Sequence, residues 1–345
     1  MARVPTIRSL ARRLRLSVAT VSEALRNAPR VKAATRERVQ RAAARVGYTP
    51  NPLLGAALSA VRRGRHQHYR GTLALIDAIE REPAHYLTFH REIAAGAEKR
   101  AQELGFQTEL FWLGEGPTQL SHRRLSGMVR ARGIPGAVLL PFNTARDFSD
   151  FDFTRIAAVQ MDHSVLQPLL HTVQPDHYVS MVRVLERLAL RGHRRIGLCL
   201  EDRKDLRVKR KWSAGYLAYG NGLVPPLMVP VLTRELFLDW FRRQRPDAII
   251  GHVQAMVSWL AEEGINVPGD VGFLNLNLTE RTGPCAGLDL EPRKLGAVAI
   301  EMVVGMLHRQ ERGVPERPQT ITLEATWCEG PTLRAGVESA ATSNG

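Results

Sequence analysis

Residues 16–27, LSVATVSEALRN, carry three hydroxyl side chains on a short and otherwise mostly apolar stretch. Ser17, Thr20 and Ser22 can each donate and accept hydrogen bonds, so they suit anionic oxygens such as those of phosphate. Their side chains are also short, which lets the backbone approach a ligand closely. Whether they do this chemistry depends on the elements that position them and on the charge around them.

The net charge of the chain is confined to its first fifth. The 345 residues sum to +14 at pH 7, and residues 1–70 hold 16 Lys and Arg against only Glu23 and Glu37, so the remaining 275 residues are neutral overall. Because Lys and Arg displace the counterions condensed on phosphate, a basic patch confined to one module indicates a nucleic-acid binder. A solubilising basic tail is the alternative, but such tails lack the apolar periodicity that this segment has.

That periodicity predicts three short helices. Apolar residues at i, i+3, i+4 and i+7 predict a first helix over residues 7–14, with Thr6 as its N-cap. A second helix begins three residues later and is capped by Ser17. Its inward stripe is expected to comprise Val18, Val21 and Leu25, and its outward residues Ala19, Thr20, Ser22, Glu23 and Arg26. A third helix over residues 34–46, ending at Gly47, completes a helix-turn-helix module. Its buried residues are expected to be Val39, Ala42, Ala43 and Val46.

In such a module the N-terminal residues of the second helix enter the major groove of DNA. Val18 and Ala19 are then expected to meet thymine methyl groups or base edges. Ser17, Thr20 and Ser22 are expected to bind phosphates, helped by the positive end of the helix dipole. The alternative is that these hydroxyls are merely exposed helix residues, and the surrounding positive charge favours DNA.

The order S-V-A-T-V-S, T-R-E-R-V and G-Y-x-P-N resembles the DNA-binding head of the lactose-repressor/galactose-repressor (LacI/GalR) family of bacterial transcription regulators. The resemblance implies that Val18, Ala19 and Glu23 stand at specificity positions. It also implies phosphate contacts from Thr20 and Ser22, and further contacts from Lys32 and Thr35 at the third helix. The whole expected DNA interface comprises Thr6, Ser17, Val18, Ala19, Thr20, Ser22, Glu23, Arg26, Lys32, Thr35, Tyr48, Asn51, Leu54 and Leu58.

Two residues of the head depart from the family pattern. Arg15 stands where the family usually has the glycine of the turn, at a cost of about 1 kcal/mol if its φ is positive. Glu23 replaces a commonly basic residue, and a carboxylate accepts a hydrogen bond from cytosine N4 instead of donating to guanine. Base recognition by Glu23 and a merely solvated carboxylate are both open.

The third departure lies in the linker, PNPLLGAALSAVRRGRHQHYR. Family members fold a short hinge helix here when bound to DNA, and a leucine from each subunit wedges into the central minor-groove step. Counted from Tyr48 that position is Ala57, with Leu58 one residue later and Leu54 one turn earlier. Leu58 is the expected wedge, and ordinary helix packing is the alternative for both leucines. The resemblance divides the chain into a head (residues 1–49), a hinge helix and linker (50–68), and an effector-binding and dimerisation domain (69–345).

After Tyr69 the pattern changes to alternating strands and helices. Strands are expected at residues 71–76, 107–112, 137–140, 156–161, 195–200, 247–251 and 271–276. Helices are expected at residues 90–104, 178–190, 211–219, 255–263 and 295–310. Such alternation indicates parallel sheets with helices on both faces, and two similar sets indicate two lobes with a ligand cleft at the carboxyl ends of their strands. The fold class is therefore an all-α helix-turn-helix head followed by an α/β domain of two lobes.

This second module resembles the periplasmic-binding-protein-like effector domain of the same family. The resemblance rests on residues 132–141 (RGIPGAVLLP), 190–198 (LRGHRRIGL), 246–251 (PDAIIG), 263–273 (EGINVPGDVGF) and 327–334 (WCEGPTLR). Trp212 stands where sugar-binding members have an arginine that holds the ligand, and Asn277 where an aspartate is usual. Trp212 can stack on a ring or anchor the core, and Asn277 can bind a hydroxyl or form an Asx turn. Asp77 and Glu80, just past the first strand, are cleft candidates by position alone.

Several function classes find no support in the sequence. No G-x-G-x-x-G, Walker A or G-x-S-x-G motif occurs, and Cys199, Cys285 and Cys328 lack metal-ligand spacing, so neither an enzyme nor a cofactor is expected. No stretch of about 18 apolar residues and no signal peptide occurs, which favours a cytoplasmic protein without membrane contact. A sugar-binding transport protein would need export and would not carry the basic head.

The expected function is that of a homodimeric, sequence-specific transcription regulator, with a repressor as the first hypothesis. It is expected to bind a pseudo-palindromic operator in double-stranded DNA and to respond to a small effector, in first place a carbohydrate. The alternative is a DNA-binding regulator that acts without a ligand and has a degenerate effector cleft.

Overall fold

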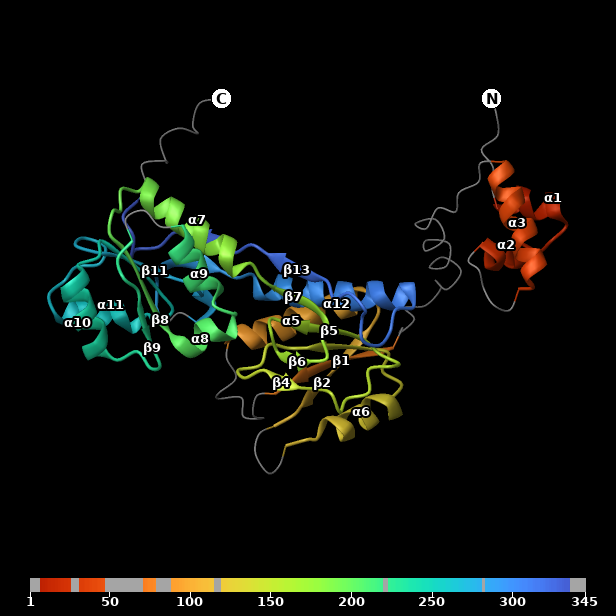
Figure 1. Ribbon diagram of the computed structural model, residues 1–345, viewed down its shortest axis with the longest axis horizontal. Helices are drawn as coiled ribbons and strands as arrows, with labels where there is room; N and C mark the ends of the chain where they lie inside the picture. Colours follow the sequence, from red (N-terminus) through yellow and green to blue (C-terminus); the bar gives the residue numbers. More distant parts are fainter. Residues whose placement is uncertain are drawn as a thin grey trace. The chain divides into compact units, whose positions relative to one another are not determined.

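The computed structural model describes residues 7–25, 31–46, 71–78, 88–114, 119–219, 223–280 and 283–335 (Figure 1). The chain divides into two compact units, Met1–His68 and Tyr69–Gly345. The two units are described separately below.

Within its described residues, the first unit is a bundle of three short helices. They are α1 (Ile7–Leu14), α2 (Val18–Leu25) and α3 (Ala33–Arg45). The first two match the helices predicted from sequence, and α3 begins one residue before the predicted start. Its expected C-cap, Gly47, lies outside the described residues. The core of the bundle comprises Leu10, Ala11, Val21, Ala24, Val31, Val39 and Ala43.

The second unit contains two six-stranded sheets, and each sheet forms the centre of one lobe. The sheet of lobe 1 has the order β13-β7-β5-β3-β1-β2 and is parallel throughout. Its strands are β1 (Thr72–Asp77), β2 (Gln107–Trp112), β3 (Gly136–Leu139), β5 (Ala157–Met161), β7 (His171–Pro175) and β13 (Thr320–Leu323). A two-stranded ribbon beside it consists of β4 (Arg146–Asp147) and β6 (Val165–Gln167).

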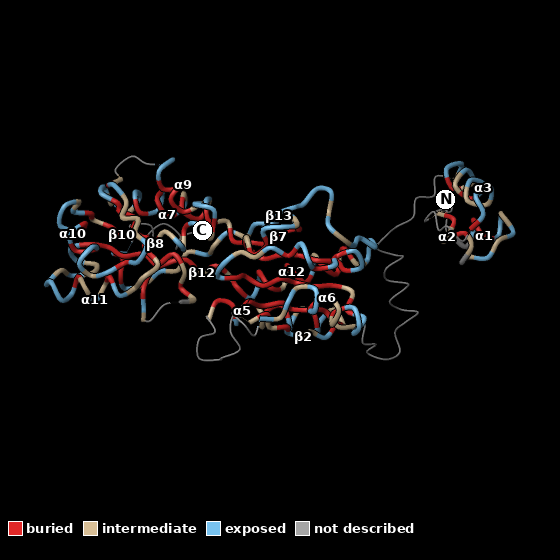
Figure 2. The backbone as a smooth tube through the Cα atoms, turned by 60° about the horizontal axis from the view of Figure 1, so that its bottom comes forward, coloured by how far each residue is buried: buried red, intermediate tan, exposed pale blue. Residues whose placement is uncertain are grey.

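Helices cover both faces of this sheet. On one face α5 (Thr88–Glu103) and α12 (Pro292–Arg309) pack over side chains such as Leu73, Val138 and Val159. On the other face α6 (His122–Ala131) packs through Leu125 and Val129. Figure 2 shows buried backbone running through the sheets and along the inner sides of the helices. The arrangement confirms the predicted α/β layers.

The contact between α5 and α12 depends on two glycines. A Cβ atom on Gly96 would overlap the carbonyl oxygen of Arg293, and one on Gly296 would overlap that of Ile93. The two helix backbones therefore approach each other more closely than a residue with a Cβ atom would allow. This contact fixes the start of α12, where the chain enters lobe 1 from lobe 2.

The sheet of lobe 2 has the order β14-β12-β11-β10-β8-β9, with only β14 antiparallel. Its strands are β8 (Ile196–Glu201), β9 (Leu227–Val229), β10 (Ala248–Gly251), β11 (Gly272–Asn275), β12 (Ala286–Asp289) and β14 (Thr326–Cys328). One face is covered by α7 (His177–Leu190) and α9 (Lys211–Ala218), and the other by α10 (Arg234–Gln244) and α11 (Ala255–Glu262). The short helices α8 (Asp202–Arg207) and η3 (Leu278–Glu280) follow β8 and β11 at their carboxyl ends.

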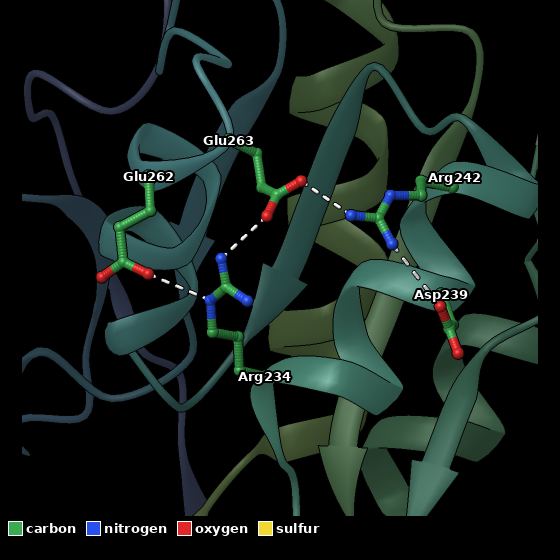
Figure 3. Close-up of polar contacts among 5 residues, drawn as sticks. All are labelled: Arg234, Asp239, Arg242, Glu262 and Glu263. Carbon is green, nitrogen blue, oxygen red and sulfur yellow. Dashed lines mark hydrogen bonds and ion pairs between the residues drawn. The ribbon is translucent and has the colours of Figure 1, made fainter.

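The outer pair of helices in lobe 2 is joined by charged side chains. Figure 3 shows Arg234 at the start of α10 bonded to Glu262 and Glu263, at 3.0 and 2.7 Å. Glu263 also accepts a 2.7 Å hydrogen bond from Arg242, which lies 3.6 Å from Asp239. The shared Glu263 carboxylate thus links both ends of α10 to the end of α11.

The chain crosses between the lobes three times within the described residues: from β7 to α7, from β12 to α12, and from β13 to β14. The alternation matches the prediction from sequence, but several elements were not predicted, namely α6, α8, α10, η3, β4, β6, β7, β9, β12, β13 and β14. The prediction also placed Leu140 inside a strand, whereas β3 ends at Leu139.

Candidate nucleic-acid interface and effector cleft

The start of α2 is fixed by the side chain of Ser17. Its hydroxyl oxygen accepts a 3.0 Å hydrogen bond from the backbone N–H of Thr20 and lies 2.8 Å from the Thr20 hydroxyl. The predicted N-cap is therefore present. Ser17 is exposed and Thr20 is half-buried. The cap residue and its hydrogen-bond partner thus lie together at the N-terminal end of the helix.

The turn between α1 and α2 has a left-handed residue. Leu16 N–H donates to the carbonyl of Ala11 at 3.0 Å, and Arg15 N–H donates to that of Arg12 at 3.3 Å. These two hydrogen bonds form the helix-ending motif that requires a positive φ at the first residue past the cap. Arg15 has a φ of 53°. The predicted cost of about 1 kcal/mol for a residue other than glycine at positive φ therefore applies to Arg15.

The orientation of α2 agrees with the predicted inward stripe. Val21 and Ala24 are fully buried, and Val18 and Leu25 pack partly buried against the same core. Thr20 and Glu23 are half-buried. Ala19 and Ser22 lie on α2, but their side chains are outside the described part of the structure.

The described part of the head also carries exposed basic side chains on α1, on the turn and on α3. Lys32, at the N-cap position of α3, is exposed, and Thr35 in its first turn is half-buried. The exposed arginines of the described head are Arg12, Arg13, Arg15, Arg38, Arg41 and Arg45. The arginine Arg38 donates to the carbonyl of Leu14 and so ties α3 to the end of α1. Six predicted DNA contacts, together with one predicted effector contact, lie outside the described residues: Thr6, Arg26, Tyr48, Asn51, Leu54, Leu58 and Glu80.

In the second unit, the predicted effector residues have different environments. Asp77 is fully buried at the end of β1. Trp212, in the first turn of α9, is 4% exposed and packs edge-on against His177 with ring centroids 5.0 Å apart. Asn277 forms an Asx turn, because its side-chain oxygen accepts from Thr279 N–H at 3.1 Å. Trp212 thus packs as a core residue, and Asn277 shapes the chain beyond β11.

Sequence reasoning missed a buried polar group to which both lobes contribute. His90 of α5 and Asp162 after β5 belong to lobe 1, and His177 of α7 belongs to lobe 2. Arg207 of α8, also in lobe 2, is half-buried. The carboxylate of Asp162 lies 3.9 Å from Nε2 of His177. Burial lowers the pKa of His90 to about 3, and the positive charge of Arg207 adds to this shift. Burial alone would raise the pKa of Asp162, but the contact with His177 and the charge of Arg207 outweigh it and lower that pKa.

A second buried pair lies at the carboxyl ends of β8 and β10. Nε2 of His252 is 3.4 Å from a carboxylate oxygen of Glu201, and the other oxygen accepts from Leu232 N–H at 3.3 Å. Burial lowers the pKa of His252 to about 4 even though Glu201 opposes this. At the carboxyl ends of these strands, the Glu201 carboxylate is therefore already hydrogen-bonded within lobe 2.

A cavity of about 560 Å³ opens between the start of α5, η3 and the connection from β12 to α12. Its size is that of an ordinary small-molecule site. It is lined by Thr88, Glu92, Leu278, Thr279, Asp289, Glu291, Pro292 and Arg293. Most of these residues carry a hydroxyl or a carboxylate group. Asn277, a predicted effector contact, directly precedes the lining residue Leu278 in the chain.

A basic helix-turn-helix head and an α/β domain of two lobes with three crossings are together typical of one class of DNA-binding transcriptional regulators. A family model described as "Bacterial regulatory proteins, lacI family" matches residues 6–51, and one described as "Periplasmic binding protein-like domain" matches residues 185–333. The chain belongs to the LacI family of DNA-binding transcriptional regulators.

Curated relatives extend over most of the chain. The HTH-type transcriptional repressor CytR of Escherichia coli K12 is 26% identical over 334 residues, which cover 90% of this chain and 92% of CytR. The HTH-type transcriptional regulator DegA of Bacillus subtilis is 24% identical over 340 residues, which cover 92% and 95%.

Solved structures show the same fold at low identity. A lac repressor dimer bound to operator and the anti-inducer ONPF has a TM-score of 0.57 at 16% identity, covering 96% of this chain and 100% of that one. A complex of the regulator CelR with cellobiose has a TM-score of 0.54 at 19% identity, covering 95% and 99%. Within the described residues, no helix is long and apolar enough to cross a membrane.

Proposed function

We propose that this regulator is a homodimeric repressor that binds a pseudo-palindromic operator through the N-terminal half of α2. One observation carries the proposal: the capped start of α2, with Ser17 exposed, lies on the unit that holds +13 of the chain's net charge of +14. A single head spans only a few base pairs, so two heads related by a twofold axis are needed to select one site in a genome. Such a protein acts on the chromosome, in the cytoplasm, and needs no catalytic group.

The residues that we propose to contact DNA are those predicted from sequence. Val18, Ala19 and Glu23 meet base edges, and Ser17, Thr20 and Ser22 bind phosphates. Lys32, Thr35 and the residues outside the described ranges add backbone contacts, with Leu58 as the minor-groove wedge. The test is selection of bound fragments from a random DNA library by the intact protein. Recovery of one inverted repeat supports the proposal, whereas recovery of fragments that share no sequence contradicts it.

The effector is proposed to be a small carbohydrate that binds between the lobes. The hydroxyl and carboxylate lining of the 560 Å³ cavity suits a polyhydroxylated ligand, and the cellobiose bound to CelR gives a first candidate. A ligand that prefers one arrangement of the lobes would bias whether the hinges of the dimer can pair, and so would change operator affinity. Asp77, Glu80, Trp212 and Asn277 stay the contacts predicted from sequence, but Asp77, Trp212 and Asn277 are not among the residues that line this cavity.

One observation favours the alternative of a regulator without a ligand. Trp212, a predicted effector contact, is only 4% exposed and packs against His177 of its own lobe, so it is not open to a ligand. Thermal unfolding with a panel of sugars that includes cellobiose separates the two: stabilisation by one sugar supports an effector, and no response to any of them supports the ligand-independent regulator.

A further inference from the structure

We infer that Arg15 is a phosphate-binding residue. An arginine occupies this left-handed position because its guanidinium contacts the DNA backbone. The inference rests on the proposed placement of α2 on DNA. It adds a residue of the turn to the contacts predicted for the helices.

The backbone at Arg15 gives no reason for an arginine. A φ of 53° brings the Cβ atom of an L-residue close to the following carbonyl oxygen, so glycine or asparagine is favoured there. The two hydrogen bonds that end α1 use only backbone atoms of Arg15, Leu16 and their partners. Any residue that tolerates this φ would make the same turn. A strained residue that the local structure does not need is a candidate for a functional role.

The charge at Arg15 is also not needed by the neighbouring helix. A cation at the C-terminus of α1 would favour its dipole, but Arg12 and Arg13 already occupy the last turn of α1. Among the described residues no carboxylate forms an ion pair with Arg15, and the residue is exposed. Its guanidinium is therefore available to an anion from outside this part of the chain.

The position of Arg15 suits phosphate. It precedes by two residues Ser17, whose hydroxyl caps α2, so it lies next to the positive end of that helix. Backbone phosphates that border a major groove are the anions such a helix start meets. The planar guanidinium can donate two parallel hydrogen bonds to one phosphate, which a lysine cannot do.

The test uses the full chain with Arg15→Asn, which tolerates a positive φ and lacks the charge. Arg15→Lys keeps the charge. The matched control is Arg41→Gln, because Arg41 is 74% exposed on α3 and belongs to the same head. Binding is measured over a salt series to the duplex selected by the wild type and to an unrelated duplex of equal length. Amide exchange over residues 7–25 reports on the fold of the head.

We expect Arg15→Asn to leave amide exchange unchanged or slower, because the strain is relieved. Binding to both duplexes should weaken about tenfold, and the slope of log K against log salt should become shallower by about 2 for a dimer that loses two phosphate contacts. Arg15→Lys should retain the slope, and Arg41→Gln should change it less than Arg15→Asn does.

Three results would overturn the inference. Arg15→Asn could bind with the affinity and slope of the wild type, Arg41→Gln could cause an equal loss, or Arg15→Asn could speed exchange and so show that the arginine supports the fold. A wild type that does not distinguish the two duplexes would instead contradict the proposed operator function, and the inference with it.

Discussion

The hydroxyl oxygen of Ser17 lies 3.0 Å from the backbone nitrogen of Thr20, and this hydrogen bond satisfies an N–H group that the first turn of α2 cannot pair by itself. The residue that caps the helix is also a proposed phosphate contact. These two roles can be separated by substitution.

Replacing Ser17 with alanine removes the cap, which should cost about 1 kcal/mol of head stability and weaken operator binding. Ser17→Asp restores the cap but places a carboxylate at the proposed phosphate contact. We therefore expect Ser17→Asp to regain slow amide exchange in α2 without regaining operator affinity. Wild-type affinity in Ser17→Asp would show that Ser17 does not approach phosphate.

Glu23 lies half-buried on α2, one turn after the proposed base-reading edge. If its carboxylate accepts from cytosine N4, Glu23→Arg should change which operator is preferred, because an arginine donates to guanine instead. Fragment selection with the wild type and the variant measures this directly. If both recover the same sequence and differ only in affinity, Glu23 does not recognise a base.

The close approach of α5 and α12 predicts opposite effects for two glycine substitutions. Gly96→Ala puts a methyl group into the backbone of Arg293, so it should destabilise the second unit by about 1–3 kcal/mol or more. Gly127, in the middle of α6, has no atom within 4 Å of a Cβ position, and Gly127→Ala should stabilise by up to about 1 kcal/mol. Urea unfolding followed by tryptophan fluorescence compares them. Equal effects would contradict the packing described for α5 and α12.

His90 makes the stability of the second unit depend on pH. Its folded pKa of about 3 lies below the ordinary 6.5, so between these values the unfolded chain binds a proton that the folded one does not. Stability should therefore fall as pH decreases from about 6.5 towards 3, with His90 contributing at most about 1.4 kcal/mol per pH unit. His252 adds to the same trend, because its folded pKa is about 4.

The variant His90→Gln removes one titrating group and should flatten this dependence. Urea unfolding at pH 7 and pH 5 compares it with the wild type. A variant that loses as much stability between these two pH values as the wild type does would show that His90 is not held neutral in the folded state.

The elements that sequence predicted well are those with a strong apolar period or an apolar strand. Helix α1 follows from Leu10, Ala11 and Leu14, and β10 from its run of Ala and Ile. The strand β7, HTVQP, was missed because His171, Gln174 and Pro175 do not resemble a buried strand, although all five residues are buried between β5 and β13. The helix α10 had a usable signal, since Thr233 caps it and its apolar residues recur at helical spacing.

The cap at the start of α2 was predictable because its residues are neighbours in sequence. Ser17 and Thr20 are three positions apart, so the cap follows from local spacing alone. The polar group between the lobes was not predictable, because His90, Asp162, His177 and Arg207 come from four separate elements that only the three crossings bring together. Trp212 was correctly placed at the start of a helix, but its burial depends on His177 and on packing that spacing does not determine.

The central claim is that the basic head, through α2, holds the protein on DNA. Its most direct test compares the intact chain with a chain that begins at Tyr69, binding the selected duplex over a salt series. If each subunit neutralises about four phosphates, the intact dimer should give a slope of log K against log salt of roughly −7. The shortened chain should show no measurable binding; equal affinity and slope for the two chains would contradict the account.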